Sequence, residues 1–156
     1  MHLHASGGNL LFVVVPVLVP FFQRHSTGPR DGLGDDVFRC DELLAEPHTS
    51  LGHAYFHEFN WPAAAREFKR GLELNANYAI GHFYFANYLL AMGQFQDALA
   101  EARHAKALDP ISLPARSNTA SALYYCGQYD LAVEQCLQVL EIDPKFARTY
   151  EDLGRI

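Results

Sequence analysis

"AIGHFYFANYLLAMGQFQDALAEARHAKALDPIS", residues 79–112, is followed directly by "LPARSNTASALYYCGQYDLAVEQCLQVLEIDPKF", residues 113–146. The two stretches are in register at a spacing of 34 residues, so that small residues, glycines and an Asp-Pro pair fall at equivalent places. A fixed period of this length indicates an array of repeated supersecondary units, each packing on the next. The equivalent residues are Gly93 and Gly127, Ala98 and Ala132, and the pairs Asp109-Pro110 and Asp143-Pro144.

The spacing of apolar residues in the first stretch predicts helices. Phe85, Leu89 and Met92 recur at i, i+4 and i+7, which is the period of a helix with one buried stripe. Gly93 follows and ends that helix, because glycine readily adopts the positive φ of a helix terminus. Asp109 ends the next helix, since the residue before a proline is pushed out of the helical region. Each unit is therefore expected to contain two helices, and the alanines at equivalent places allow close helix contacts.

This pattern resembles the tetratricopeptide repeat family, in which every unit is a pair of antiparallel helices. The resemblance implies an all-α fold, an α-solenoid in which the pairs stack into a superhelix. The first unit departs from the pattern, since Phe59 replaces the glycine between its helices and Ala76 replaces the closing proline. Counted in steps of 34 residues, the units are 45–78, 79–112 and 113–146, with a partial fourth unit at 147–156.

Residues 1–36 do not share the repeat pattern. The apolar run at residues 10–22, LLFVVVPVLVPFF, has 13 residues, too few for a membrane-spanning helix, and Pro16 and Pro20 would break that helix. No Lys or Arg precedes the run and no small-residue cleavage motif follows it, so we expect neither a secretory signal nor a membrane anchor. The stretch after the run is rich in glycine and charge, as in a linker. We therefore predict that residues 1–36 are poorly ordered and that residues 37–156 form the repeat domain.

Composition and motifs exclude several classes of function. The net charge of −6 with neutral histidines argues against binding to nucleic acid or anionic membranes, which requires clustered Lys and Arg. The three cysteines form no Cys-x-x-Cys pair and are odd in number, so we expect no disulfide framework and a cytoplasmic location. No nucleophile motif, phosphate loop or paired-acid arrangement is present in the sequence, so we expect neither an enzyme nor a cofactor.

The resemblance also implies where a partner would bind. In this family the first helices of successive units line a concave groove, so the chain is predicted to be a protein–protein interaction module that binds a peptide or partner segment there. Exposed aromatic residues on such a face anchor peptides, because they bury a large area at little cost in entropy. The alternative is that some of these rings only pack against neighbouring helices. The predicted groove residues are Thr49, His53, Phe56, His57, Phe83, Asn87, Leu90, Ser117, Ser121, Tyr124 and Tyr125.

One variety of the family binds the carboxyl-terminal tails of chaperones, and most of the residues it uses are replaced here. That variety holds the terminal carboxylate with Lys and Asn side chains on adjacent first helices. Asn87 matches one Asn, but Thr49 and Phe83 stand at the Lys positions and His53 replaces the other Asn. We therefore expect no capture of an Asp-rich carboxyl terminus.

The remaining histidines and glutamates are expected to have structural roles. His53 and His57 are spaced i, i+4, but two ligands make a poor metal site, so no metal is predicted. His48 and His82 occupy the Trp position of the family and are expected to pack between helices. The glutamates of the second helices are expected to form a solvated outer face. These glutamates are Glu67, Glu73, Glu101, Glu134 and Glu141.

An alternative function rests on residues 58–75, EFNWPAAAREFKRGLELN. They resemble the repeat tails of bacterial winged-helix regulators, adenylate cyclases and Ser/Thr kinases, so the chain would be a detached regulatory or sensory tail.

The repeat pattern also predicts a partner for the helix at residues 147–156, since repeat arrays normally finish with a capping helix. We therefore expect either a fragment of a longer protein or self-association through this open carboxyl-terminal edge.

Overall fold

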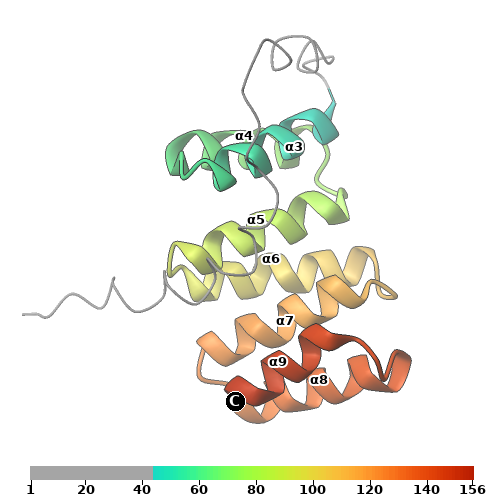
Figure 1. Ribbon diagram of the computed structural model, residues 1–156. Coiled ribbons are helices and arrows are strands. Elements are labelled where there is room, and N and C mark those ends of the chain that lie inside the picture. Colours follow the sequence, from blue (N-terminus) through green and yellow to red (C-terminus); the bar gives the residue numbers. More distant parts are fainter. Residues whose placement is uncertain (1–43) are drawn as a thin grey trace, which may run out of the picture.

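The computed structural model describes residues 44–156, and this part of the chain consists of seven α-helices with no β-strand (Figure 1). The predictions for residues 1–36, including the apolar run at residues 10–22, lie outside the described residues. The predicted all-α solenoid is confirmed. No helix of the described part is both long and apolar enough to cross a membrane. The helices are α3 (Ala45–His57), α4 (Trp61–Leu74), α5 (Ala79–Ala91), α6 (Phe95–Leu108), α7 (Leu113–Tyr125), α8 (Tyr129–Ile142) and α9 (Ala147–Arg155).

The helices form two layers of a stack. Each first helix packs against the second helix of its own unit, in the pairs α3–α4, α5–α6 and α7–α8. The first helices also contact one another, from α3 to α5, α5 to α7 and α7 to α9, whereas α4, α6 and α8 make no comparable contacts with one another. Figure 1 shows the pairs stacked from α3 and α4 at one end to α8 and α9 at the other. Because the first helices lie closer together than the second helices, they form the inner, concave layer.

The turns inside the units confirm the predicted helix ends. Gly93 and Gly127 both have a φ of 74°, in the left-handed region where glycine is favoured. Phe59 occupies the equivalent position in the first unit and makes the same kind of turn with a φ of 59°, although it is not glycine. Its ring contacts Trp61, with the centroids 5.4 Å apart. This contact offsets part of the cost of a bulky residue in the left-handed region.

Small residues lie in the core between the helices. Ala64, Ala98 and Ala132, each one repeat from the next, are fully buried in one continuous core cluster. A Cβ atom added at Gly52 would lie 2.8 Å from the ring of the buried Phe68, so a larger residue there would displace that ring. The core cluster runs from α4 to α8, because each unit covers the apolar surface of the next.

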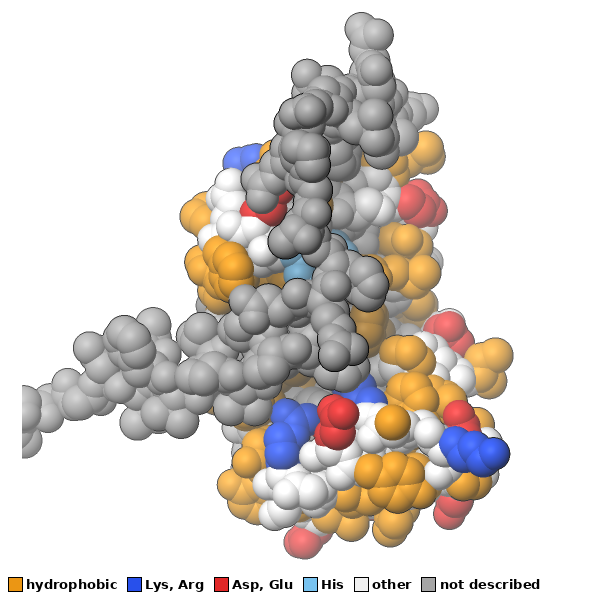
Figure 2. Space-filling model, viewed as in Figure 1, with side chains coloured by type: hydrophobic (Ala, Val, Ile, Leu, Met, Phe, Trp, Pro, Cys, Tyr) orange, Lys and Arg blue, Asp and Glu red, His pale blue; other side chains and the backbone are white. Residues whose placement is uncertain are grey.

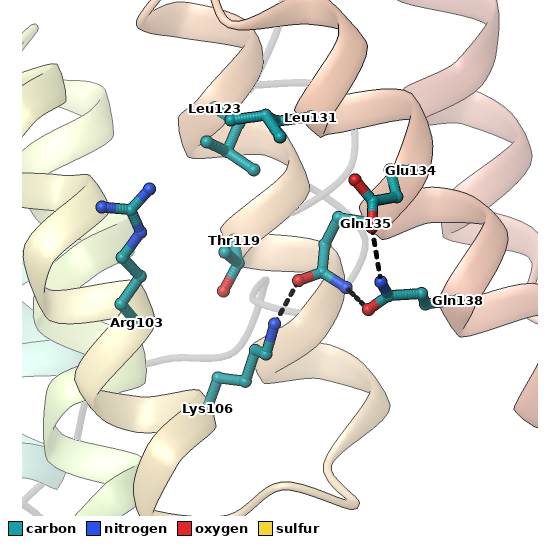
Figure 3. Close-up of a pocket in the computed structure, with 8 residues that line it drawn as sticks. All are labelled: Arg103, Lys106, Thr119, Leu123, Leu131, Glu134, Gln135 and Gln138. Carbon is teal, nitrogen blue, oxygen red and sulfur yellow. Dashed lines mark hydrogen bonds between the residues drawn. The ribbon is translucent and has the colours of Figure 1, made fainter.

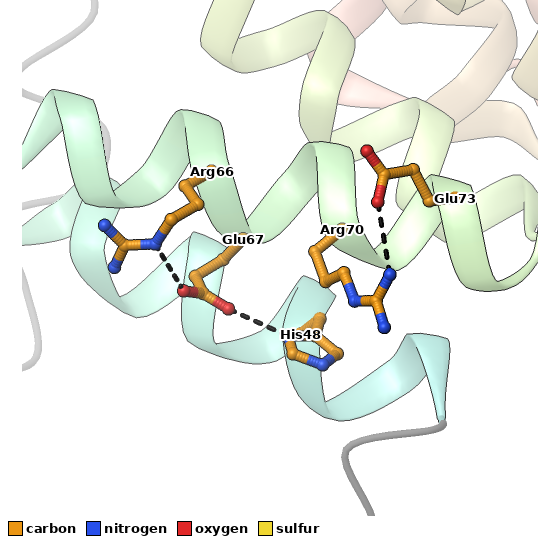
Figure 4. Close-up of polar contacts among 5 residues, drawn as sticks. All are labelled: His48, Arg66, Glu67, Arg70 and Glu73. Atoms are coloured by element: carbon orange, nitrogen blue, oxygen red, sulfur yellow. Dashed lines mark hydrogen bonds and ion pairs between the residues drawn. The ribbon is translucent and has the colours of Figure 1, made fainter.

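A histidine–glutamate contact joins the two helices in each of the first two units. His48 Nδ1 lies 2.8 Å from Glu67 Oε2, and His82 Nδ1 lies 2.5 Å from Glu101 Oε2. The buried Glu67 also accepts a hydrogen bond from Arg66 Nε at 3.2 Å (Figure 4). The predicted packing role of both histidines is confirmed. The prediction that Glu67 and Glu101 belong to a solvated face is wrong, because each carboxylate faces the histidine of the preceding helix.

Polar contacts hold α9 against α7. Asp152 is buried and accepts hydrogen bonds from Ser117 Oγ at 2.8 Å and from Ser121 Oγ at 3.0 Å. Arg155, one turn further along α9, also donates to this carboxylate. α9 therefore covers a polar stripe of α7, with the Asp152 carboxyl group at its centre.

Candidate functional site

The layer of first helices carries a set of aromatic and histidine rings that keep part of their surface exposed. They come from α3, α5 and α7, the helices that line the concave side of the stack. Asn87 of α5 is also partly exposed and lies on the same layer. We call the set of rings the aromatic face. It consists of His53, Phe56, His57, Phe83, Tyr84, Tyr124 and Tyr125.

The rings of α3 and α5 contact one another across the first two units. The ring centroid of His53 lies 4.3 Å from that of Tyr84 and 4.5 Å from that of His57. Phe56 lies 5.7 Å from His57, and Phe83 lies 5.2 Å from Tyr84, again between centroids. Tyr84 was not among the predicted groove residues, because the repeat positions pointed to its neighbour Phe83. Because Phe83 and Tyr84 are adjacent aromatic residues in the sequence, that pair could have indicated both as candidates.

The rings of α7 contact rings of the neighbouring second helices. Tyr125 stacks on Phe95 at the start of α6, with centroids 5.2 Å apart and ring planes 14° from parallel. Tyr124 lies 5.2 Å from Tyr125 and 5.7 Å from Tyr129 of α8. The alternative considered from the sequence, that some rings pack against neighbouring helices, therefore applies to Tyr125 and Tyr124, and also to Phe56, whose ring centroid lies 5.4 Å from that of Trp61 of α4. All three rings nevertheless keep part of their surface exposed.

Four of the predicted groove residues offer no surface to a partner in this structure. Thr49, Leu90, Ser117 and Ser121 are all buried. The two serines are covered by α9, because both hydroxyl groups donate to Asp152. Thr49 lies where α3 meets the glycines of α4 and α5, and Leu90 belongs to the core cluster. The prediction that these four line an open groove is corrected accordingly, whereas the role of the exposed residues stays a proposal.

A recess between α5, α6 and α7 adjoins the aromatic face. Ile80, Phe83 and Tyr84 line it from α5, and Pro114 lines it from the first turn of α7. Ile80 is about half exposed although it is apolar. The recess therefore offers an apolar place for one side chain of a bound segment.

A second recess lies between α6, α7 and α8 and has a different character (Figure 3). Lys106 donates to Gln135, Gln135 donates to Gln138 at 2.8 Å, and Gln138 donates to Glu134 at 3.2 Å. Burial lowers the pKa of Lys106, and the neighbouring arginine side chains lower it further. This recess contains none of the predicted groove residues, and its polar groups are largely occupied by one another.

Charged side chains of both signs are mixed on the surface. In Figure 2, blue and red side chains occur together over the lower part of the molecule, among white and orange surface. On this view, the described residues form no continuous field of positive charge.

His53 and His57 make the α3 end of the aromatic face neutral. Their Nε2 atoms lie 3.1 Å apart. Burial, and secondarily the charge of nearby His57, lowers the pKa of His53 to about 4. Burial also lowers the pKa of His57. At neutral pH both rings are therefore uncharged and act as part of the aromatic surface.

Acidification should weaken the fold through His53. Its pKa is about 4 in the folded chain and ordinarily 6.5, so the unfolded chain binds the proton more tightly, and stability falls as the pH decreases from 6.5 toward 4. Because the ring is only about half buried, solvent screening reduces the effect to about 1 kcal/mol or less. We expect His53→Gln to flatten the pH dependence of the free energy of unfolding, measured by urea denaturation. Parallel curves for the variant and the wild-type chain would contradict this assignment.

Comparisons with known proteins agree with the repeat architecture, although no protein-family model matches the chain. The chain is similar to "Small glutamine-rich tetratricopeptide repeat-containing protein 2" of Mycosarcoma maydis, with 30% identity over 113 residues, or 70% of this chain and 30% of that protein. It is also similar to "Hsp70-Hsp90 organizing protein 3" of Arabidopsis thaliana, with 25% identity over 105 residues, or 67% of this chain and 19% of that protein. The chain therefore spans 30% or less of the length of these relatives.

Solved structures share the fold. The Arabidopsis OM64 TPR domain has a TM-score of 0.68 and 19% identity, over 74% of this chain and 96% of that one. The first TPR of Spaghetti (RPAP3), bound to the HSP90 peptide SRMEEVD, has a TM-score of 0.68 and 19% identity, over 74% and 91% of the two chains. A crystal structure of MamA has a TM-score of 0.68 and 22% identity, over 77% and 70%. At these identities the likeness shows the same stack of antiparallel helix pairs.

Proposed function

Because residues 45–156 belong to the tetratricopeptide repeat family, we propose that this chain is a protein–protein interaction module that binds a peptide or partner segment along its concave layer. The aromatic face is the proposed binding surface. Phe83 and Tyr124, on adjacent first helices, are its proposed central anchors.

The observation that carries this proposal is the partial exposure of rings on the inner layer of the stack. Large apolar side chains that gather on one layer and remain in contact with water usually mark an interaction site. Aromatic anchors contribute most of the binding energy in such interfaces, because they fill pockets and have few rotatable bonds. The apolar recess beside Phe83 provides one such pocket on this face.

Structural neighbours support a peptide as the kind of partner. The first TPR of Spaghetti (RPAP3) is bound to an HSP90 peptide, the second TPR domain of human RPAP3 to an HSP70 peptide, and the TPR2B domain of yeast Sti1 forms a pHsp70 complex. In this chain, however, Thr49 is buried and Phe83 is apolar, so neither position supplies an ammonium group to a terminal carboxylate. We therefore propose a segment recognised through apolar side chains rather than through an acidic carboxyl terminus. Nothing in these similarities favours the alternative of a bacterial regulatory tail.

The test is direct binding with variants of the two anchors. Peptides selected from a random display library on the immobilised full chain are labelled and measured by fluorescence anisotropy. We expect the double variant Phe83→Ala/Tyr124→Ala to bind them at least tenfold more weakly, a loss of about 1.4 kcal/mol or more. We also expect a peptide ending in EEVD to compete poorly with the selected peptides.

A matched control is available on the outer layer. Leu137 and Ile142 of α8 are exposed apolar residues, with 51% and 52% of their surface accessible. The double variant Leu137→Ala/Ile142→Ala removes comparable apolar surface from the other side of the stack and should leave affinity unchanged. Equal affinity of the Phe83/Tyr124 variant and the wild-type chain would exclude the aromatic face, whereas a loss in the α8 variant would place the site on the outer layer.

A further inference from the structure

We propose that His82, Glu101 and His104 form a binding site for a divalent transition-metal ion of the zinc type, between the two helices of the second unit. His82 comes from α5, while Glu101 and His104 lie one turn apart on α6. Each residue offers one ligand atom, and these atoms all lie within 4.8 Å of one another. The rings of the two histidines lie side by side, with centroids 4.7 Å apart.

The orientation of His82 is that of a metal ligand. Its Nε2 lies 2.9 Å from the carbonyl oxygen of Ala76, and because a carbonyl only accepts, Nε2 carries the proton and donates. Metal-binding histidines are commonly fixed in this way, with the second ring nitrogen donating to a backbone carbonyl. In the neutral ring, Nδ1 then presents its lone pair, and it lies 2.5 Å from Glu101 Oε2. These two ligand atoms therefore already face each other, although at 2.5 Å they are too close to share one ion until the carboxylate moves outward.

The first unit contains the same pair, and within residues 44–156 no third ligand joins it. His48 and Glu67 precede His82 and Glu101 by 34 residues and lie 2.8 Å apart through the same atoms. There a cationic side chain also contacts the carboxylate, since Arg66 donates to Glu67 at 3.2 Å (Figure 4). Arg70 also lies on this helix and is paired with Glu73 at 3.2 Å.

In the second unit both arginines are replaced. The positions equivalent to Arg66 and Arg70 are Ala100 and His104. The guanidinium group that contacts the first carboxylate is therefore absent at the second, and the imidazole of His104 takes the place of the other arginine. Imidazole and carboxylate are ligands that Zn²⁺ accepts, and three protein ligands with a water molecule complete a tetrahedral site.

The site is accessible and needs only small adjustments. His82 is buried, Glu101 is partly exposed and His104 is exposed, so an ion reaches the site from solvent without opening the core. Tetrahedral Zn²⁺ separates its ligand atoms by about 3.3 Å, given metal–ligand distances of about 2.0–2.1 Å. The Glu101 carboxylate must therefore move outward slightly while the exposed His104 ring turns inward. A bound ion joins α6 to α5, the helix that carries Phe83 and Tyr84 of the aromatic face.

The experiment uses the full chain, freed of metal with a chelator and titrated with Zn²⁺ against a chromophoric competitor. The matched variant is His104→Arg, which reproduces the residue of the first unit at an exposed position. We expect the wild-type chain to bind one more equivalent of Zn²⁺ than this variant, whose affinity at the site falls by a factor of the order of a hundred or more. Zn²⁺ should raise the melting temperature of the wild-type chain but not that of His104→Arg. Bound Co²⁺ should give the strong visible absorption of a low-coordinate site only in the wild-type chain.

Two further variants make the test decisive. His57→Ala removes a histidine outside the cluster and should keep the extra equivalent. Arg66→Ala/Arg70→His gives the first unit the residues of the second and should add a second equivalent. Equal Zn²⁺ binding by the wild-type chain and His104→Arg, or loss of the equivalent in His57→Ala, would overturn the proposal. No gain in the double variant would overturn the claim that these three side chains suffice.

Discussion

Replacing Ala98 by Trp should lower the free energy of unfolding by more than about 2 kcal/mol, because a large ring placed in a fully packed helix contact forces neighbouring side chains and backbone apart. Ala98 has no exposed surface and belongs to the continuous core cluster, together with Leu89 of α5. Ala132 occupies the equivalent place on α8, also without exposed surface, and Ala132→Trp should have a similar effect. For a chain of this size, the melting temperature should fall by about 5–10 °C, measured by circular dichroism.

The same helix provides the control for this substitution. Ala100 lies two residues after Ala98 on α6, and its side chain is exposed. Ala100→Trp adds the same ring to the surface and should change stability by less than about 0.5 kcal/mol. If Ala98→Trp melted at the wild-type temperature, Ala98 could not lie at a close helix crossing, and the packing of α6 in the stack would need to be revised.

Asp152→Ala should detach α9 from the stack, with a local cost of about 3–5 kcal/mol. The carboxylate accepts hydrogen bonds from Ser117 and Ser121 and pairs with Arg155, so its removal leaves two buried hydroxyl groups without an acceptor. α9 spans only nine residues, and an isolated helix shorter than about 12 residues is marginal in water. We therefore expect the amide protons of α9 to lose protection from hydrogen exchange, while those of α5 and α6 keep theirs.

A control at the neighbouring Glu151 tests whether losing a negative charge on α9 is enough to cause this effect. Glu151 is exposed and should give wild-type exchange rates when replaced by Ala. In a double-mutant cycle, Ser121→Ala and Asp152→Ala should cost less together than the sum of the single variants, because each removes the partner of the other. Unchanged protection of α9 in Asp152→Ala would show that apolar contacts, and not this polar cluster, hold the helix.

The repeat period and the helix-ending residues were enough to predict the fold. Helix starts and turns depend on local properties of the chain, namely the conformational freedom of Gly93 and Gly127 and the restriction that Pro110 places on Asp109. Both glycines have the positive φ that their position requires. The repeat register also located the turn at Phe59, although phenylalanine by itself disfavours the positive φ that this turn requires. The exposed members of the aromatic face followed from the same register, with Tyr84 as the residue that was missed.

The burial of polar side chains was decided only by the tertiary structure. Ser117 and Ser121 lie at groove positions of the repeat, yet they are covered, because Asp152 of the following unit accepts both of their hydrogen bonds. Glu67 and Glu101 lie at positions that look solvated in the sequence, yet each meets a histidine 19 residues earlier in the chain. A periodic sequence determines which way a side chain points from its own helix. Whether water or another polar group meets it depends on how closely neighbouring helices pack, and that is fixed only when the units stack.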